Sequence, residues 1–438
     1  MLPFFRLNIF LLIFVFRILL FYLIFIERYR FIIELCGIFG LDYLRFRIIF
    51  LSFWVVFLVL LKVFEIKGIN QIIYIFLTIF LFLVLFLSFV LYEFFLFYVI
   101  FEFVLFPILL IIFGWGFYPD RLQAGIYIFF YTVFISLPLI ISFFIFYYFH
   151  RSLRFFIYMY NLDIGFYLWI FFILRIIVKF PIYIFHFWLP KAHVQAPVFG
   201  SIILAGVLLK LGGYGLIRLL PFTFNFFLFV NYFIILGLIG GIYIGIIAFH
   251  QTDLKLLVAY SSIRHIGLVF IGLLIRLNFR LYGGVLLIIG HGICSSCIFY
   301  LVDLIYNRIE SRIFILVRGY LLILRGLCLW WVLINLVNMR CPVSINLLSE
   351  IFIFISVKIY CLEYLILIVF LCFMCSIYTL YLILFSYHGV MVYFFSRGEI
   401  KLRVYLIIFI HWILLNLVFL FLENFFYFIS LKKYLFVE

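Results

Sequence analysis

The chain has 438 residues, of which 71% are hydrophobic and only 11% charged, whereas soluble domains are typically about 45–50% apolar and about 25% charged. This composition excludes an ordinary soluble globular protein. The formal charge of +15 does not indicate a nucleic-acid partner, because the basic residues stand mostly at the ends of apolar runs, as Arg28, Arg45 and Arg151 do. Anchoring at a membrane surface explains such positions. Lys62, near the end of the run 47–64, is expected to reach the interface in the same way.

Apolar runs of about 20 residues, each long enough to cross a bilayer as a helix, follow one another along the chain. They predict an all-α, polytopic membrane protein with about 14 transmembrane helices in one membrane domain, 1–438. The expected spans are 8–26, 47–64, 70–91, 93–113, 124–148, 165–184, 198–220, 227–249, 254–275, 281–305, 315–337, 343–360, 363–387 and 404–428. The first is interpreted as a retained helix, because no small-residue cleavage site follows it.

Proline interrupts two of these spans. Pro181 closely follows Lys179, and Pro342 comes shortly before Glu350, and proline removes a backbone donor and disrupts the preceding helical turn. Broken helices at corresponding positions of two halves are typical of secondary transporters.

The chain is therefore expected to contain two inverted repeats of the kind found in transporters. The first repeat is placed at 70–220 and the second at 227–388, followed by a C-terminal loop and helix at 389–438. Short connections between spans predict that neighbouring helices are antiparallel.

Ionisable residues occur deep inside the expected spans. Glu102 lies nine residues into 93–113, about 13 Å along a helix, and a charge at such depth costs at least about 2.5–3.5 kcal/mol on insertion scales. Residues of this kind usually face a bundle interior or water and have a function; the alternative is an internal ion pair that holds helices together. The same interpretation applies to Lys179, Lys210 and Glu350, and three histidines are also in apolar surroundings: His186, His265 and His291. Lys, Glu and His groups of this kind suit proton transfer, because each can change its charge when a partner moves.

Two cysteine pairs have a spacing found in metal sites, Cys294 with Cys297 and Cys372 with Cys375. Both pairs lie inside apolar helical runs, where cysteine is an ordinary small hydrophobic residue, so no metal site is expected. The sequence carries no P-loop and no dinucleotide fingerprint at the start of a soluble helix.

One long stretch carries a family resemblance. Residues 179–218 have the sequence KFPIYIFHFWLPKAHVQAPVFGSIILAGVLLKLGGYGLIR. It closely resembles the subunit 4 family of mitochondrial NADH dehydrogenase, an antiporter-like subunit of respiratory complex I. Further blocks agree in order and extend the resemblance over roughly 90–390: FEFVLFPILLIIFGWG and PDRLQAGIYIFFYT, then QTDLKLLVAYSSIRHIGLV, HGICSS, YNRIESRIFIL and SINLLSE.

The resemblance implies that the two inverted repeats are antiporter-like half-channel repeats and that each buried ionisable residue has a role. Glu102 would pair with Lys179 in the first half-channel, Lys210 would be the central relay residue, and Glu350 would be the terminal residue of the second half-channel. Three histidines would lie on the hydrated path between the halves: His186, His265 and His291.

The same resemblance implies a proton-translocating subunit that couples NADH oxidation by ubiquinone to proton pumping in the mitochondrial inner membrane. It would be part of an enzyme, NADH:ubiquinone reductase, without a redox site, cofactor or metal of its own, while the whole complex uses FMN, iron–sulfur clusters, NADH and ubiquinone. Its partners would be other complex I membrane subunits, including antiporter-like ones, and the lipid bilayer. The alternatives are a subunit of a multi-subunit cation/proton antiporter and a structural membrane subunit that transports nothing.

The chain departs from this family at several positions. Gln195 stands where glutamate is usual, Arg264 where a small residue is usual, and Ser349 where glycine is usual. Arg264 directly precedes His265, so it is expected to change the local relay geometry. Cys294 and Cys297 occupy positions where the family has other residues, which further weakens a metal interpretation.

Overall fold

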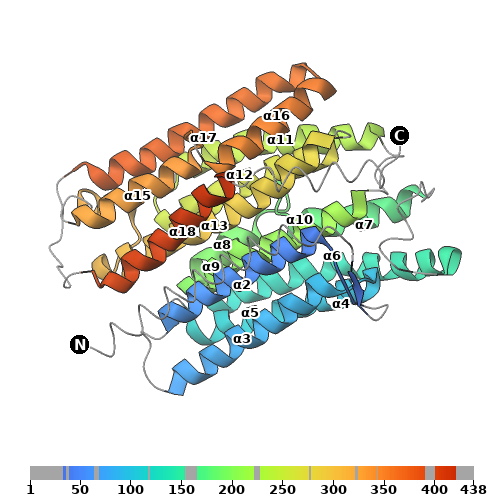
Figure 1. The fold of residues 1–438 in the computed structure, drawn as a ribbon, viewed down its shortest axis with the longest axis horizontal. Coiled ribbons are helices and arrows are strands. Elements are labelled where there is room, and N and C mark those ends of the chain that lie inside the picture. The colour runs from blue at the N-terminus through green and yellow to red at the C-terminus, as the bar shows by residue number, and fades with distance from the viewer. Residues whose placement is uncertain are drawn as a thin grey trace.

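Apolar helices make up almost all of the described part of the chain (Figure 1). The computed structural model describes residues 33–35, 39–63, 69–116, 119–151, 153, 165–220, 227–275, 278–320, 324–342, 344–389 and 400–420. The elements are β1 (Ile33–Leu35), β2 (Phe39–Leu41), α2 (Tyr43–Val63), α3 (Ile69–Val90), α4 (Phe94–Phe103), α5 (Leu105–Trp115), α6 (Arg121–His150), α7 (Phe166–Lys179), α8 (Trp188–Gln195), α9 (Val198–Ile203), η1 (Leu204–Leu208), α10 (Leu209–Leu219), α11 (Phe227–Phe249), α12 (Leu254–Leu274), α13 (Asn278–Ile309), η3 (Phe314–Val317), α15 (Arg325–Asn338), α16 (Ile345–Tyr360), α17 (Glu363–Tyr387) and α18 (Leu402–Leu420).

The predicted class is confirmed: the chain is an all-α, polytopic membrane protein. In the described residues, nine helices are long and apolar enough to cross a membrane, and α15 and α18 are shorter apolar helices. The expected span 8–26 lies outside the described residues, and each of the other expected spans overlaps a helix. A small antiparallel hairpin of β1 and β2, which the hydropathy pattern did not predict, precedes α2.

Two predicted spans have different boundaries in the structure. The helix expected at 315–337 begins only at Arg325, because the chain first makes a 3-10 turn over Phe314–Val317 and Gly319 then adopts a positive φ of 67°, which a helix does not allow. The helix expected at 165–184 ends at Lys179. Phe180, which precedes Pro181, has left the helical region with φ −92° and ψ 86°, as expected for a residue before proline.

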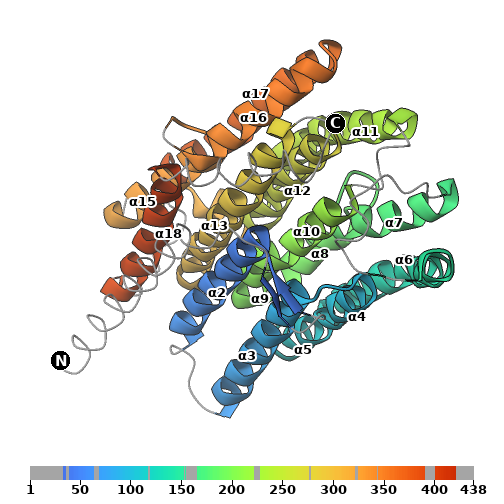
Figure 2. The same ribbon diagram turned by 45° about the vertical axis from the view of Figure 1, so that its right-hand side comes forward.

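The long helices lie side by side along one common direction, with α2–α6 on one side and α15–α18 on the other (Figures 1 and 2). Helix α13 lies between these groups and contacts α2, α9, α12, α15, α16 and α18. An apolar stretch of 18 residues in α13 is entirely buried inside the protein. Side chains on α13 are therefore enclosed by protein, the environment in which a polar group inside a membrane is tolerated.

Both expected helix breaks occur. After Lys179 the chain turns through 180–187, forms the short helix α8 and starts again at α9. The second break lies between α15 and α16, where Arg340 adopts a positive φ of 73°, and the hydroxyl of Ser344 caps α16 by accepting from the backbone N–H of Leu347 at 3.4 Å. Each break lies beside a buried charged side chain, Lys179 at the first and Arg340 at the second.

Candidate functional site

The first polar cluster joins α4 to α7. The Oε2 atom of Glu102, near the end of α4, lies 4.0 Å from the Nζ atom of Lys179, so the structure brings these two predicted residues together. The guanidinium of Arg175 contacts the other carboxylate oxygen of Glu102. Arg175 and Lys179 are four residues apart on α7, which places both side chains on the same face of that helix. One carboxylate therefore faces two cations.

Arg175 was missed by the sequence analysis, although an arginine four residues before a buried lysine inside an apolar run was a visible signal. Its Nη1 atom donates to the backbone oxygen of Thr132 on α6 at 2.6 Å. The ring of Phe101 lies 5.3 Å from the Arg175 guanidinium carbon and 4.4 Å from Lys179 Nζ, within cation–π range. Because a guanidinium does not release its proton in proteins, Lys179 is the cation of this cluster that can change charge.

The second cluster is centred on Lys210, which lies on α10 directly after the π-helical turn η1. Such turns often occur at functional sites because the wide turn disturbs the regular hydrogen-bond ladder. Here the backbone oxygen of Ala205, inside η1, accepts a hydrogen bond from Lys210 Nζ. The same ammonium group lies 3.0 Å from Nδ1 of His291 on α13. A lysine has only donors, so Nδ1 of His291 is the acceptor whenever Lys210 is charged.

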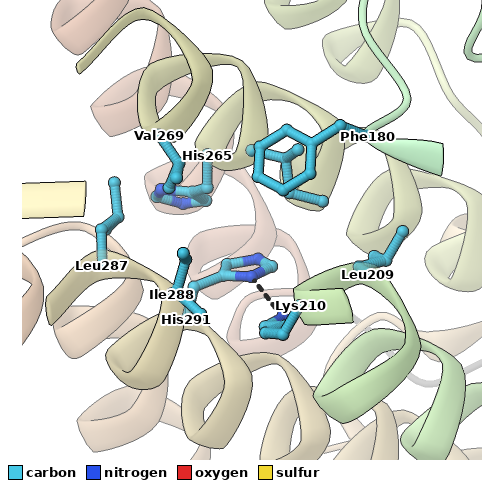
Figure 3. Close-up of a pocket in the computed structure, with 9 residues that line it drawn as sticks. Phe180, Leu209, Lys210, His265, Val269, Leu287, Ile288 and His291 are labelled. Carbon is cyan, nitrogen blue, oxygen red and sulfur yellow. Dashed lines mark hydrogen bonds between the residues drawn. The ribbon is translucent and has the colours of Figure 1, made fainter. Parts of the chain in front are cut away.

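A small cavity connects Lys210 with two histidines (Figure 3). Phe180, Lys210, His265, His291 and apolar side chains line it, and about 10 Å³ is open to the centre of a water molecule, close to what one buried water requires. The ring centroids of His265 and His291 are 5.2 Å apart. Phe180 directly follows Lys179 in the chain, so this cavity begins where the first cluster ends.

The third cluster surrounds Glu350 on α16. Its Oε1 atom lies 3.8 Å from Nδ1 of His265, and its Oε2 atom contacts the guanidinium Nε of Arg340 at the second helix break. Glu350 is 1% exposed and His265 is fully buried. The structure thus places Glu350 beside His265, whose ring faces that of His291, and adds Arg340, which the sequence did not single out.

His186 lies apart from these clusters. Its ring stacks on Phe187 at 4.4 Å and on Tyr183 at 5.7 Å between centroids, in the turn between α7 and α8. Among the described residues, no hydrogen bond or ion pair joins its side chain to Lys179 or Lys210. The structure places His186 beside the break in α7.

A polar group outside these clusters corrects one prediction. Lys62 does not reach the interface: it is 5% exposed and forms an ion pair with Asp303 of α13, which also accepts from Asn307 at 3.1 Å. Asp303 lies inside the apolar run 281–305, so the sequence already indicated a buried acidic partner for a basic residue such as Lys62. Nearby, the buried Lys255 donates to the backbone oxygen of Ala196 at 2.7 Å.

The cysteines that have metal-like spacing are packed in the helix bundle. Cys294, Cys297 and Cys375 are buried, Cys372 is half-buried, and all are free thiols. Across the described ranges, no group of three or more His, Cys, Asp or Glu side chains is arranged to hold a metal ion.

A search of protein families matches residues 92–375, which contain all three clusters, to the membrane region of the NADH:quinone oxidoreductase/Mrp antiporter family. The chain belongs to this family. Within it, the chain is 40% identical over 390 residues to NADH-ubiquinone oxidoreductase chain 4 of Ceratitis capitata, covering 87% of this chain and 86% of that one. It is 44% identical over 389 residues to the chain 4 protein of Aedes aegypti, covering 86% of each.

The fold of this family member also matches solved structures. A chain in the structure of respiratory complex I from Thermus thermophilus with bound NADH superposes with a TM-score of 0.81 at 20% identity, over 92% of this chain and 89% of that one. A chain of an archaeal membrane-bound sulfane sulfur reductase superposes with a TM-score of 0.74 at 16% identity, over 88% of this chain and 81% of that one. At such identities these likenesses establish the fold alone.

Proposed function

We propose that this chain is the subunit 4 of respiratory complex I in a mitochondrial inner membrane, and that it moves protons across that membrane with energy from NADH oxidation by ubiquinone. The high identity to animal chain 4 proteins over most of both chains supports the assignment to this complex. The observation that carries the transport role is the succession of buried polar clusters, from Glu102 and Lys179 through Lys210 and His291 to Glu350.

The proton route follows these clusters through the interior of the bundle. The cavity beside Phe180 holds room for one water next to Lys210, and a bridging water can pass a proton between groups that do not touch. Lys179 and Lys210 lie in the first half-channel repeat, 70–220, while His265, His291 and Glu350 lie in the second, 227–388. The family resemblance also assigns His186 to this route, although in the structure it lies beside the helix break, apart from the three clusters.

The chain itself supplies no redox chemistry in this proposal. FMN, iron–sulfur clusters, NADH and ubiquinone are bound by other subunits, and this subunit contributes only titratable side chains, backbone groups and water. Its partners are the other membrane subunits of the complex, including further antiporter-like subunits, together with the lipid bilayer.

The test uses the intact complex in its own membranes. A native gel of solubilised membranes, stained for NADH dehydrogenase activity and probed for this chain, distinguishes complex I from a separate cation/proton antiporter, which the family description also includes. The isolated complex is then reconstituted in vesicles, and proton uptake is measured during NADH oxidation for the wild type and for Lys210→Met. Co-migration with the activity and loss of proton uptake in Lys210→Met support the proposal. A variant that assembles fully and pumps like the wild type refutes the transport role.

A further inference from the structure

We propose that Arg264 is a positioning residue that holds His265 in a single tautomer, as a fixed hydrogen-bond donor toward Glu350, and so keeps His265 from carrying protons through its ring. This inference rests on the proposed transport function and concerns one step between Lys210 and Glu350.

The two ring nitrogens of His265 face different partners. Nδ1 lies 3.8 Å from Oε1 of Glu350, and Nε2 lies 3.1 Å from Nη2 of Arg264. A guanidinium has only N–H donors and no acceptor. The hydrogen bond between Arg264 and His265 therefore requires that Nε2 accepts, so the ring proton belongs on Nδ1. That proton then points to the carboxylate, and a shift of about 1 Å closes the gap to hydrogen-bond length.

Arg264 is itself fixed by further contacts. It is 1% exposed, and its Nη1 atom donates to the backbone oxygen of Leu371 at 3.2 Å. Its Nη2 atom also contacts Sγ of Cys375, and the ring of Tyr378 lies 5.1 Å from the guanidinium carbon. These contacts to α17 hold the donor over Nε2, so the hydrogen bond to His265 does not depend on a freely rotating side chain.

The other polar neighbours of the ring do not select a tautomer. Asn338 is a polar neighbour of His265, and an amide can present either its oxygen or its NH2 group. His291 faces the ring across the cavity at 5.2 Å between centroids (Figure 3), and an imidazole can likewise donate or accept. Arginine is the one neighbour among these whose hydrogen-bonding role is fixed.

The consequence concerns the proton path. An imidazole carries a proton by accepting it on one nitrogen and releasing it from the other. At His265 the nitrogen that would accept, Nε2, already accepts from Arg264, and a second N–H there would face the donors of Arg264. In this proposal a proton from the Lys210–His291 pair does not pass through the His265 ring, and His265 instead orients the Glu350 carboxylate that receives it.

The decisive variant is His265→Asn, measured as proton uptake per assembled complex. Asparagine cannot titrate, but its amide NH2 group occupies about the place of Nδ1 and still donates to Glu350. If His265 only donates to Glu350, proton uptake by His265→Asn is expected to stay within about fivefold of the wild type, the scale of one altered hydrogen bond. A proton-carrying ring predicts a loss of about 10²-fold, and that result overturns the proposal.

Variants of Arg264 test the tautomer directly. Arg264→Lys keeps a group that can only donate, so this variant is expected to retain most of the proton uptake. The glutamine side chain of Arg264→Gln can also accept a hydrogen bond from Nε2–H, so the His265 ring can adopt either tautomer. Proton uptake is then expected to fall several-fold. In the His265→Asn background no tautomer remains to be selected, so Arg264→Gln adds no further loss, a coupling that a double-mutant cycle measures. If Arg264→Gln lowers proton uptake by the same factor in the wild type and in His265→Asn, the proposal is contradicted.

A control separates this role from packing. Cys375→Ala removes one contact of Arg264 on α17 but leaves those with Leu371 and Tyr378 and the hydrogen bond to His265, so uptake is expected to stay near the wild-type level. If Cys375→Ala lowers proton uptake as much as Arg264→Gln does, Arg264 has a packing role instead. If Lys210→Met and His265→Asn both abolish proton pumping, the proposed transport function stands, but the inference about His265 fails.

Discussion

In the first cluster, Arg175 of α7 forms an ion pair with Glu102 of α4. Because removing one partner of a buried pair leaves the other charge uncompensated, at a cost of about 3–5 kcal/mol, we expect Glu102→Gln to reduce the amount of assembled complex as well as proton transport. The double variant with Arg175→Met is expected to recover assembly and to remain deficient in transport. The measurement is complex on a native gel together with proton uptake per complex. Full recovery of both by the double variant would leave Glu102 with a structural role only.

Lys179 is the second cation of that cluster and the one able to release a proton. We expect Lys179→Met to lower proton uptake by about 10²-fold, the contribution of a positioned proton-transfer group. Lys179→Arg is expected to keep part of the uptake, because arginine retains the charge beside Glu102 but releases a proton poorly. Reconstituted vesicles report both rates. Wild-type pumping by a fully assembled Lys179→Met complex would remove Lys179 from the mechanism.

The contact between α13 and α16 gives a prediction about stability. A Cβ atom at Gly283 would lie 2.7 Å from the backbone oxygen of Ser349 and 2.8 Å from Cγ1 of Ile353, and the backbone atom cannot move aside cheaply. We expect Gly283→Ala to destabilise the subunit by about 1–3 kcal/mol, as overpacking typically does, and to lower the amount of complex. Gly114→Ala is the control, because nothing lies within 4 Å of its Cβ position. Equal thermal stability of the two complexes would contradict this packing.

The sequence predicted the helices well because a spanning helix has a physical signature in one dimension, a long apolar run. The break after Lys179 was equally readable, since proline acts on its own backbone and its immediate neighbour. The late start of α15 at Arg325 was not readable in this way, because residues 315–324 form a mostly apolar run in the sequence, whereas the backbone leaves the helical region at Arg318 and Gly319.

The candidate site was predicted in part for a related reason. Glu102, Lys210 and Glu350 were recognised because an isolated charge in an apolar run is conspicuous. Arg175 and Arg340 were not, although each contacts one of the predicted acids. Their partners lie on other helices, and sequence position does not reveal which buried charges face one another across a bundle.

Glu350 provides the sharpest test between a proton pump and a structural subunit. It sits on the first turns of α16, where the hydroxyl of Ser349 donates to the backbone oxygen of Asn346 at 2.7 Å and Arg340 holds one carboxylate oxygen. We expect Glu350→Gln to lower proton transport and NADH:ubiquinone turnover together, because a coupled pump does not run freely with one step blocked. Part of the loss will appear as missing complex, since Gln leaves the Arg340 charge unpaired.

Glu350→Asp completes this test. Aspartate keeps an ionisable group about one methylene shorter, so the pump interpretation predicts that it retains part of the transport while the isosteric glutamine retains less. A purely structural carboxylate predicts the opposite order, because glutamine preserves the shape of the side chain, whereas aspartate draws the carboxylate away from Arg340 and leaves unfilled space in the core. Both variants are measured in the same membranes, with turnover and proton uptake normalised to assembled complex. If glutamine is the milder change after that normalisation, Glu350 does not carry protons in this subunit.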